Sequence, residues 1–558
     1  MNRRTEVTLM MWSLAAAAAC HGDRAAGPAT PTCSSALASP LVLAIGAYTS
    51  LDPASDGGCV TIAANSSTLD SAEYLIVPQS AAGTFGQSSP FELRAATLAA
   101  VAMPAAQWAG PVSSPRDVAV QFDGMLRRLG RTRVAGAAAR PPVGPVRATV
   151  TPQLAAPPAP GTLRTFAVCS SLDCSRFTAV TARAKTVGQH IAIYVDTLAP
   201  AGGLDSADID TLAQVFDSRL YPLDTATFGG VSDIDTNSVV IVLMTGVVNK
   251  LSASAKCASS GYVAGFFFPP DLDTAAPLDS SNHGEIFYSI VADPNGTLSC
   301  THSRAGVKST LPGTFTHEFQ HMINFAQHVL LRPGFQTEEG WLDEGLSKYA
   351  EELAGRSYLQ QGDTATFSDL AFDDVYDTYQ YLSATGESPL LIQYDQGTLA
   401  EIGASWLFVR YLVDQFGDSL PRKLDGTTLA GSANVAAQTG QSFATSLTRW
   451  ALANWVSDLP GFAAPPELAY TAWRFRTRTF ASLNAQDPTR FPTPYPLVPT
   501  SSAGTAVNLS GTLRSGSGVY LRALQGPGAG AFTLEFDRAG GAAFPAAVAP
   551  RLSVIRIR

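Results

Sequence analysis

The pattern of apolar positions changes along the chain and predicts an α+β fold. His190–Val195 has the alternation of a strand, and Val239–Met244 is a continuous apolar run short enough to be a buried strand. Asp205–Tyr221 between them has the spacing of a helix. Strands followed by a run of helices are typical of α+β domains. Longer helical patterns follow around residues 311–330, 341–354, 400–416 and 441–457.

The regions on both sides of this centre carry shorter β-type runs. Tyr74–Val77 and Phe91–Arg94 lie among turn residues near the N-terminus, and Val519–Ala523 and Phe532–Phe536 lie between glycine clusters near the C-terminus. An Ala- and Pro-rich stretch separates the first region from the centre and favours extended backbone. We therefore expect a β-rich module over 21–130, a linker over 131–165, the α+β domain over 166–460, a linker over 461–500 and a second small β-rich module over 501–558.

The first twenty residues have the pattern of an export signal. A basic head with Arg3 and Arg4 precedes an uncharged apolar stretch that is too short to span a membrane. Cys20 directly follows a run of alanines and resembles the lipidated cysteine of bacterial lipoproteins, although Ala17 stands where that signal prefers Leu. Ordinary cleavage after small residues is the alternative. In either case we expect an exported protein, secreted or held as a lipoprotein at the outer surface or in the periplasm.

Composition and cysteine content agree with export. The 558 residues carry a formal net charge of −9 with only 15% charged residues, which gives no reason to expect a nucleic-acid partner. Seven cysteines leave six for disulfides if Cys20 carries a lipid. Their order suggests three local pairs among the connectivities that six cysteines allow: Cys33–Cys59, Cys169–Cys174 and Cys257–Cys300.

The candidate chemistry is concentrated in the segment Thr314–Phe325. His317 and His321 lie four residues apart, so on a helix both imidazoles point from one face and can bind one ion. Glu318 lies beside them, placed to act on a water molecule at the metal rather than to bind the metal. Apolar neighbours bury the other faces of the helix. The segment therefore predicts a catalytic zinc site.

A zinc site of this kind needs a third protein ligand. A third histidine at the metzincin spacing is excluded, because Asn324 and Gln327 occupy the required positions and His328 falls one residue late. Glu344 follows at a distance that allows a turn and a returning helix, and it is the preferred third ligand. Four nearby carboxylates remain alternatives: Glu338, Glu339, Glu351 and Glu352.

The two segments together resemble the gluzincin-type zinc peptidases. His317–Asn324 followed by Trp341–Ser347 is most similar to the hyicolysin-type neutral metallopeptidases, and the likeness runs from about Phe166 to Leu459. The resemblance implies a zincin-like metallopeptidase domain between the two β-rich modules, with zinc as its cofactor. It also implies roles for four residues: His317, His321 and Glu344 as zinc ligands and Glu318 as catalytic base.

Two positions depart from the family pattern. Asp343 stands where the motif of the third ligand usually has Asn. Lys348 occupies the place where thermolysin-like enzymes carry an aspartate that supports a histidine ligand. Asp343 is the alternative for that supporting role.

The expected reaction also needs a donor for the oxyanion. Zinc activates a water molecule, and Glu318 takes its proton and returns it to the leaving amine. Stabilising the oxyanion is commonly the task of a Tyr or His besides the metal. Tyr394 is the preferred candidate among four tyrosines that follow the third ligand, the others being Tyr376, Tyr379 and Tyr381, and an ordinary packed tyrosine is the alternative.

A second metal is a weaker expectation. Asp233, Asp235 and Asn237 resemble the opening of an EF-hand calcium loop, but Ser238 and Met244 stand where Gly and Glu are required. A turn before the buried strand explains the same residues.

The sequence thus predicts an exported zinc endopeptidase that acts on protein or peptide substrates, with a membrane tether if Cys20 is lipidated. Two alternatives stay open. One is a surface adhesin or binding lipoprotein on a peptidase-like scaffold. The other is an aminopeptidase, for which no Gly-x-Met-Glu-Asn-like segment is found upstream.

Overall fold

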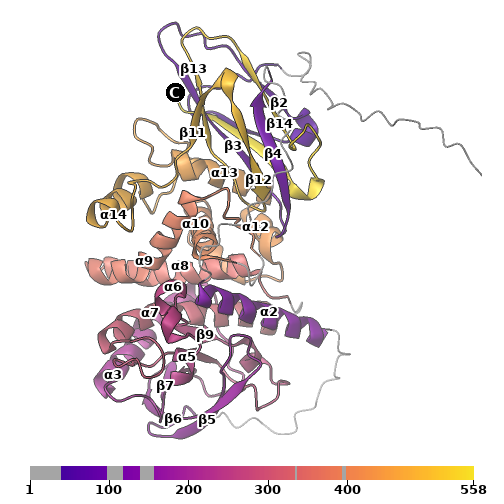
Figure 1. Ribbon diagram of the computed structural model, residues 1–558. Coiled ribbons are helices and arrows are strands. Elements are labelled where there is room, and N and C mark those ends of the chain that lie inside the picture. Colours follow the sequence, from indigo (N-terminus) through magenta and orange to yellow (C-terminus); the bar gives the residue numbers. More distant parts are fainter. Residues whose placement is uncertain (1–38, 97–116, 139–155, 333–335, 393–396) are drawn as a thin grey trace, which may run out of the picture.

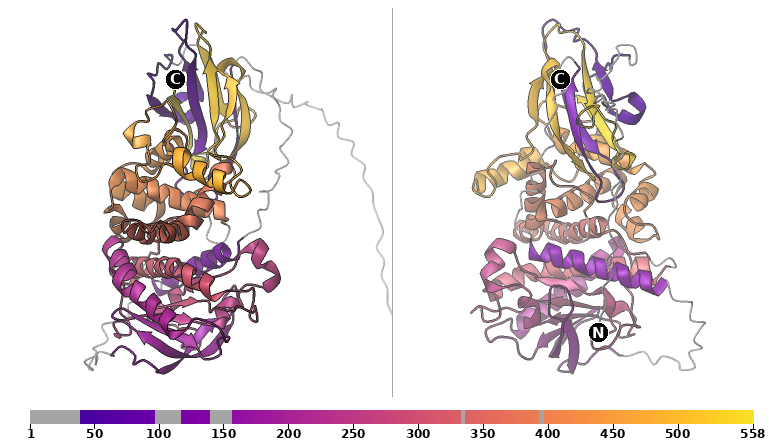
Figure 2. Two further views of the ribbon diagram at one scale, coloured as in Figure 1. Left: turned by 90° about the vertical axis from the view of Figure 1, so that its left-hand side faces the viewer. Right: turned by 45° about the vertical axis from the view of Figure 1, so that its right-hand side comes forward.

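The computed structural model describes residues 39–96, 117–138, 156–332, 336–392 and 397–558. Its elements form three layers along one axis (Figure 1). A mixed sheet with its helices lies at one end, a layer of helices lies in the middle, and a β-sandwich lies at the other end, as the turned views also show (Figure 2).

The sheet at one end has six strands in the order β5-β6-β7-β8-β10-β9. The central strands β7, β8 and β10 are parallel, whereas β5, β6 and the edge strand β9 are antiparallel to their neighbours. β8 is buried at every position, which explains its unbroken apolar run. The strands are β5 (Leu163–Cys169), β6 (Phe177–Val187), β7 (Ile191–Asp196), β8 (Val240–Met244), β9 (Gly265–Phe267) and β10 (Ile286–Ser289).

The four long helices that the apolar spacing predicted are present as α7, α8, α10 and α13. α7 packs on the sheet through Phe315, whose ring centroid lies 5.3 Å from that of Phe287 on β10, and on the helical turn after α3 through Phe319, whose ring centroid lies 5.1 Å from that of Phe216. α9 was not predicted, and it packs against α8 and α10. The helices are α3 (Ser206–Val215), α4 (Tyr221–Thr227), α7 (Arg304–Phe325), α8 (Gly340–Leu359), α9 (Thr364–Ser383), α10 (Leu399–Phe416), α11 (Leu420–Asp425), α12 (Gly431–Thr439), α13 (Phe443–Val456) and α14 (Ala481–Gln486).

The fully buried carboxylate of Glu352 connects the helices of the middle layer. It forms ion pairs with Arg356 of the same helix, at 2.6 Å, and with Arg410 of α10, at 3.4 Å. It also accepts hydrogen bonds from the indole nitrogens of Trp406 and Trp473 at 3.1 and 2.7 Å. A buried carboxylate is tolerated when its oxygens are paired in this way, so Glu352 fixes α8 against α10.

The β-rich segments at the two ends of the described chain do not form separate modules. Their strands alternate within two sheets of one sandwich, in the orders β1-β15-β3-β13-β11 and β12-β4-β14-β2. Each segment alone has too few strands to cover its apolar face, and pairing closes a common core. The strands of the sandwich are β1 (Tyr48–Leu51), β2 (Cys59–Ile62), β3 (Ala72–Ser80), β4 (Ser88–Ala95), β11 (Thr500–Ala503), β12 (Asn508–Arg514), β13 (Leu521–Gln525), β14 (Phe532–Asp537) and β15 (Pro550–Arg556).

Two regions expected to be module or linker contain packed structure. Helix α2 (Val118–Ala138) crosses the expected boundary at residues 130 and 131, and its buried Phe122 ring lies 5.1 Å from that of Phe266 on the sheet. In the second expected linker, 461–500, the aromatic rings of Phe475 and Phe480 are buried in the same core as the helices. The second stretch therefore belongs to the packed core.

The disulfide predictions are confirmed where the structure describes both partners. Cys169 pairs with Cys174, and Cys257 pairs with Cys300. Cys59 is also disulfide-bonded, and its expected partner Cys33 lies outside the described residues, as does Cys20. Among the described residues, no helix has both the length and the apolar character needed to cross a membrane.

The close approach of α10 to α9 generates a stability prediction. A Cβ at Gly403 would overlap the backbone of Asp377 and Thr378. Gly403→Ala should therefore lower the free energy of unfolding by about 1–3 kcal/mol through overpacking, although alanine is the better helix former. Thermal unfolding followed by circular dichroism measures the change. Gly526→Ala, where a Cβ meets nothing within 4 Å, is the control, and an unchanged midpoint for Gly403→Ala would contradict the close packing.

Candidate metal centre

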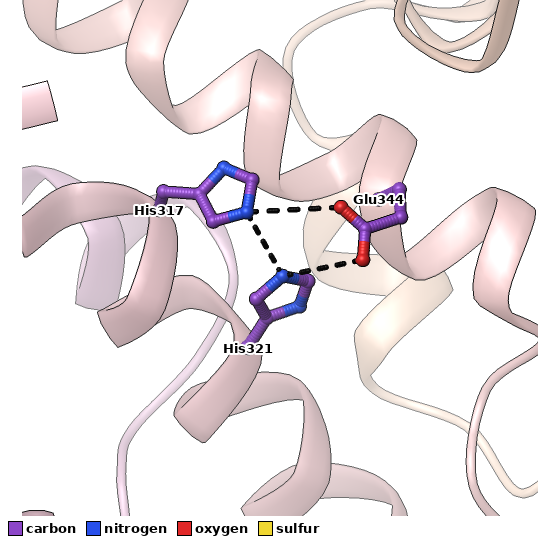
Figure 3. Close-up of side chains that lie close together, drawn as sticks. All are labelled: His317, His321 and Glu344. Carbon is purple, nitrogen blue, oxygen red and sulfur yellow. Dashed lines mark hydrogen bonds and ion pairs between the residues drawn. The ribbon is translucent and has the colours of Figure 1, made fainter. Parts of the chain in front are cut away.

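The structure brings together the two histidines and the distal glutamate that the sequence singled out. α7 carries His317 and His321 one turn apart, and α8 carries Glu344 opposite them (Figure 3). The Nε2 atoms of the histidines lie 3.1 Å apart. The carboxylate oxygens of Glu344 lie 3.7 Å from Nε2 of His317 and 3.6 Å from Nε2 of His321. Three donor atoms thus converge within 4.8 Å of one another.

Each imidazole is oriented by a carboxylate on its outer side. Nδ1 of His317 lies 2.8 Å from Oε1 of Glu351, and Nδ1 of His321 lies 3.0 Å from Oδ1 of Asp343. Oγ of Ser347 lies 2.9 Å from the same Nδ1 of His321. Because a carboxylate accepts a hydrogen bond, it keeps a proton on each Nδ1 and turns the Nε2 lone pairs toward Glu344.

The donor atoms fit a cation at their centre. Burial by itself lowers the pKa of His317, but its hydrogen bond to Glu351 and the nearby carboxylates outweigh burial and raise that pKa to about 9. A proton shared by the two Nε2 atoms bridges only the two histidines. It leaves Oε1 of Glu344 buried without a hydrogen-bond partner among the described residues. A divalent ion can bind all three side chains. Two imidazoles and one carboxylate form the ligand set of a catalytic zinc site, which keeps one position open.

Glu318 lies beside the donors and is held by the edge strand of the sheet. Its Oε2 accepts a hydrogen bond from the backbone N–H of Phe267 on β9 at 2.7 Å. Burial raises the pKa of Glu318 above its ordinary value, which moves this carboxylate toward the range where it can accept and return a proton.

Two cations balance the carboxylates that orient the histidines. Nζ of Lys348 lies 3.1 Å from Glu351, and the Arg127 guanidinium of α2 lies 3.6 Å from Asp343. Burial raises the pKa of Asp343 to about 6, although Arg127 opposes that rise. Lys348 therefore neutralises Glu351, the partner of His317. Asp343 contacts His321, which is the supporting role predicted for Asp343 as the alternative.

The other candidate third ligands face elsewhere. Glu338 accepts hydrogen bonds from the backbone of Gly431 and from Asn434, and Glu339 accepts one from the indole of Trp341. Glu352 binds the arginines and tryptophans of the middle layer. Glu351 touches the histidine pair only on the Nδ1 side.

The structure describes three of the four tyrosines that are candidate donors for the oxyanion. Tyr394 lies outside the described residues. Tyr379 donates its hydroxyl hydrogen to Thr493 at 3.1 Å, and Tyr381 stacks on Trp450, so both are packed side chains. Tyr376 alone of the described three lines the cavity that contains His317, Glu318 and Glu344.

Helix α2 contributes residues that the sequence did not reveal. Asp123 lines the same cavity, and its Oδ1 is buried without a hydrogen-bond partner among the described residues. Burial, followed by the charges of Glu318 and Glu344, raises its pKa well above the usual range. Asp123 and Arg127 lie almost two hundred residues before His317, so no local spacing could have connected them to the site.

The acidic loop before β8 gathers Asp233 and Asp235 with Glu285, their carboxylate oxygens lying within 4.8 Å of one another. The backbone of Ser238 donates to Asp233, and Ser232 donates its hydroxyl hydrogen to Glu285. The first bond closes a turn within the loop, and the second ties the loop to the residue before β10. Calcium there stays a prediction.

Comparison with known proteins identifies a peptidase relative. The chain is 28% identical over 209 residues to the neutral metalloprotease ShpI of Staphylococcus hyicus, in an alignment that covers 37% of this chain and 41% of that relative. The chain thus matches less than half of the relative's length. This finding confirms the predicted resemblance to the neutral metallopeptidases. No family model matches the chain.

Two solved structures of an M1 zinc metallopeptidase from Deinococcus radiodurans also match, one of them a mutant bound to a Tyr-Ser-Ala substrate. Their sequence identities are 14% and 16%, and each match covers 52% of this chain and 51% of the other, with a TM-score of 0.28. A TM-score of this size carries no argument about fold. The donor set and the sequence relative are what support a zinc metallopeptidase.

The geometry predicts different losses of metal for two neighbouring glutamates. Glu344→Ala removes a donor and should abolish stoichiometric zinc binding. Glu351→Gln keeps all three donors and loses only the orientation of His317, so zinc affinity should fall by about 10- to 100-fold. Competition with a chromophoric chelator measures both. Glu387→Gln, at an exposed position, is the control, and equal affinity for Glu344→Ala and wild type would exclude Glu344 as a ligand.

Proposed function

We propose that this protein is an exported zinc-dependent endopeptidase. The observation that carries the proposal is the convergence of His317, His321 and Glu344 with Glu318 beside them, in a chain similar to a neutral metalloprotease. The hydrogen bonds to Glu351 and Asp343 add to it, because they leave both Nε2 atoms free for a metal. A binding scaffold without activity has no use for a buried carboxylate beside such donors.

The chain's own residues have distinct tasks in this proposal. His317, His321 and Glu344 hold the metal, which when bound supplies a Lewis acid for activating water and polarising the peptide carbonyl. Glu318 accepts a proton from the attacking water and delivers it to the leaving amine nitrogen. The hydrogen bond from the backbone of Phe267 keeps one oxygen of Glu318 in place, which leaves the other oxygen for this transfer.

The site opens into a cavity that can receive a peptide. Its volume is about 630 Å³, and α2, α7, α8 and α9 contribute to its walls. A volume of this size lies in the usual range of ligand-binding clefts. Protein or peptide substrates therefore fit the proposed reaction.

Glu318→Gln tests the proposed base. The variant should keep near-stoichiometric zinc, because no donor is lost, and its kcat should fall by about 10²- to 10⁴-fold, the usual contribution of general acid–base catalysis. Hydrolysis of an internally quenched peptide and metal analysis of the same samples measure the two quantities. Zinc removal by a chelator and re-addition should abolish and restore activity in the wild type. Equal hydrolysis by variant and wild type would overturn the mechanism.

The same peptide, blocked at its N-terminus, separates the two peptidase alternatives. An endopeptidase cleaves it, whereas an aminopeptidase needs the free amine. The adhesin alternative predicts no zinc-dependent hydrolysis of either form.

Export rests on the first twenty residues, which lie outside the described part of the chain. If Cys20 is lipidated, protein from a bacterial host should partition into the detergent phase, and Cys20→Ser should move it to the aqueous phase. Mass spectrometry of the mature N-terminus provides the second measurement. A mature chain that begins at another residue and stays aqueous would contradict lipidation and favour ordinary signal cleavage.

A further inference from the structure

One wall of the cavity beside the metal centre is acidic. Asp369, Asp373 and Asp377 follow one another at four-residue intervals on α9, so they share one face of that helix, and Asp117, which caps α2, also lines the cavity. We call these four residues the acidic wall. It lines the same cavity as His317, Glu318 and Glu344.

The cations that line the cavity act on the acidic wall only from beyond ion-pair distance. They are Lys348, which is paired with Glu351 and with Asp374, and Arg490, whose guanidinium lies 5.3 Å from the ring centroid of Phe372. Among the described residues, neither forms an ion pair with a member of the acidic wall.

The lack of a close cation is clearest at Asp377. Its side chain is buried, with 3% exposure, and it has no hydrogen bond or ion pair among the described residues. Burial, together with the like charges of Asp373 and Asp117, raises its pKa well above the usual range, although Lys348 opposes that rise from beyond ion-pair distance. A buried carboxylate without a partner costs free energy, and a positive group in the cavity would remove that cost.

The spacing of the acidic wall favours an organic cation over a metal ion. The donor atoms of His317, His321 and Glu344 converge within 4.8 Å, whereas no such convergence is found for the acidic wall among the described residues. Apolar side chains of Leu370 and Ile402 line the cavity with the aspartates. A wall of separated carboxylates with apolar surface suits an alkyl stem that ends in an ammonium or guanidinium group.

We propose that the acidic wall binds a positively charged group of the peptide substrate and directs cleavage to bonds near that group. The group is the side chain of a lysine or arginine of the substrate. The inference rests on the proposed peptidase function, because it assigns the substrate class of the same site.

The test compares zinc-loaded enzyme on quenched peptides that differ at one position beside the cleaved bond. The position carries lysine, arginine, uncharged norleucine or glutamate, and each peptide is made with a free and with an acetylated N-terminus. We expect kcat/KM to be about tenfold higher for lysine and arginine than for norleucine. The ratio should shrink between 0.1 and 1 M salt, as the Debye length falls from about 10 to about 3 Å. The ratio should survive acetylation, because the recognised cation is a side chain. A ratio near one, with kcat/KM falling on acetylation for every peptide, would show recognition of the N-terminal ammonium instead and would overturn the inference.

Two variants connect this preference to the acidic wall. Asp373→Asn changes an exposed member and Asp377→Asn the buried one, and each should reduce the ratio of lysine to norleucine several-fold. Asp279→Asn removes the same charge at an exposed position outside the cavity and should leave the ratio unchanged. A wild-type ratio near one, or a ratio retained in both cavity variants, would overturn the inference.

A binding measurement separates this inference from the proposed function. Zinc-loaded Glu318→Gln protein is titrated calorimetrically with the lysine and norleucine peptides, and tighter binding of the lysine peptide is expected. If no peptide is hydrolysed by the wild type, the proposed function fails while the ratio of the two dissociation constants still decides the inference. Equal dissociation constants would reject cation recognition even in an active peptidase.

Discussion

The hydrogen bonds between the two histidines and the carboxylates of α8 are the interactions on which the metal centre depends. Asp343, Ser347 and Glu351 lie at four-residue intervals and therefore on one face of α8, and that face meets the Nδ1 atoms on α7. One helix thus orients both imidazoles and also supplies Glu344. A shift of α8 by one turn would remove all of these contacts together.

The register of α8 is fixed from its other side by α10. A Cβ at Gly345 would come within 2.7 Å of the carbonyl oxygen of Ser405, so only glycine permits this approach. Glu352 adds its ion pair with Arg410 on the same side. The glycine that follows the third ligand in the sequence motif therefore has a packing role, because it lets α8 lie close enough to α10 to present Glu344 to α7.

Burying so many carboxylates around one centre requires compensating charge. Lys348 neutralises Glu351 from the same helix, and Arg127 reaches Asp343 from α2. Buried charges of this kind are tolerated only when they are paired. The position where the family pattern expects an aspartate carries a lysine here, and the structure explains this, because the two supporting carboxylates already lie at other positions of α8.

The sequence predicted the parts of the site that depend on local spacing. His317, Glu318 and His321 follow from one helical turn. The prediction of Glu344 as the third ligand also required the resemblance, because spacing alone allowed other glutamates in that role. The role of Glu351 was missed for a physical reason: sequence shows that a carboxylate is near, but not which imidazole nitrogen it faces. Tyr394 and Cys20 lie outside the described residues, so their roles stay predictions.

The elements that sequence reasoning missed owe their structure to distant partners. α2 has apolar residues at helical spacing within a stretch taken for a β-rich module and a linker, and it buries Phe122 and Leu126 in the core shared with the sheet. The two β-rich segments lie more than four hundred residues apart, and alternation within each strand cannot show that they share two sheets. β4 belongs to the sandwich, whereas α2 places Asp123 in the cavity of the histidine pair and Arg127 beside Asp343. The cavity is consequently composite, because α2 and α9 contribute acidic residues beside the histidines and Glu344 of α7 and α8.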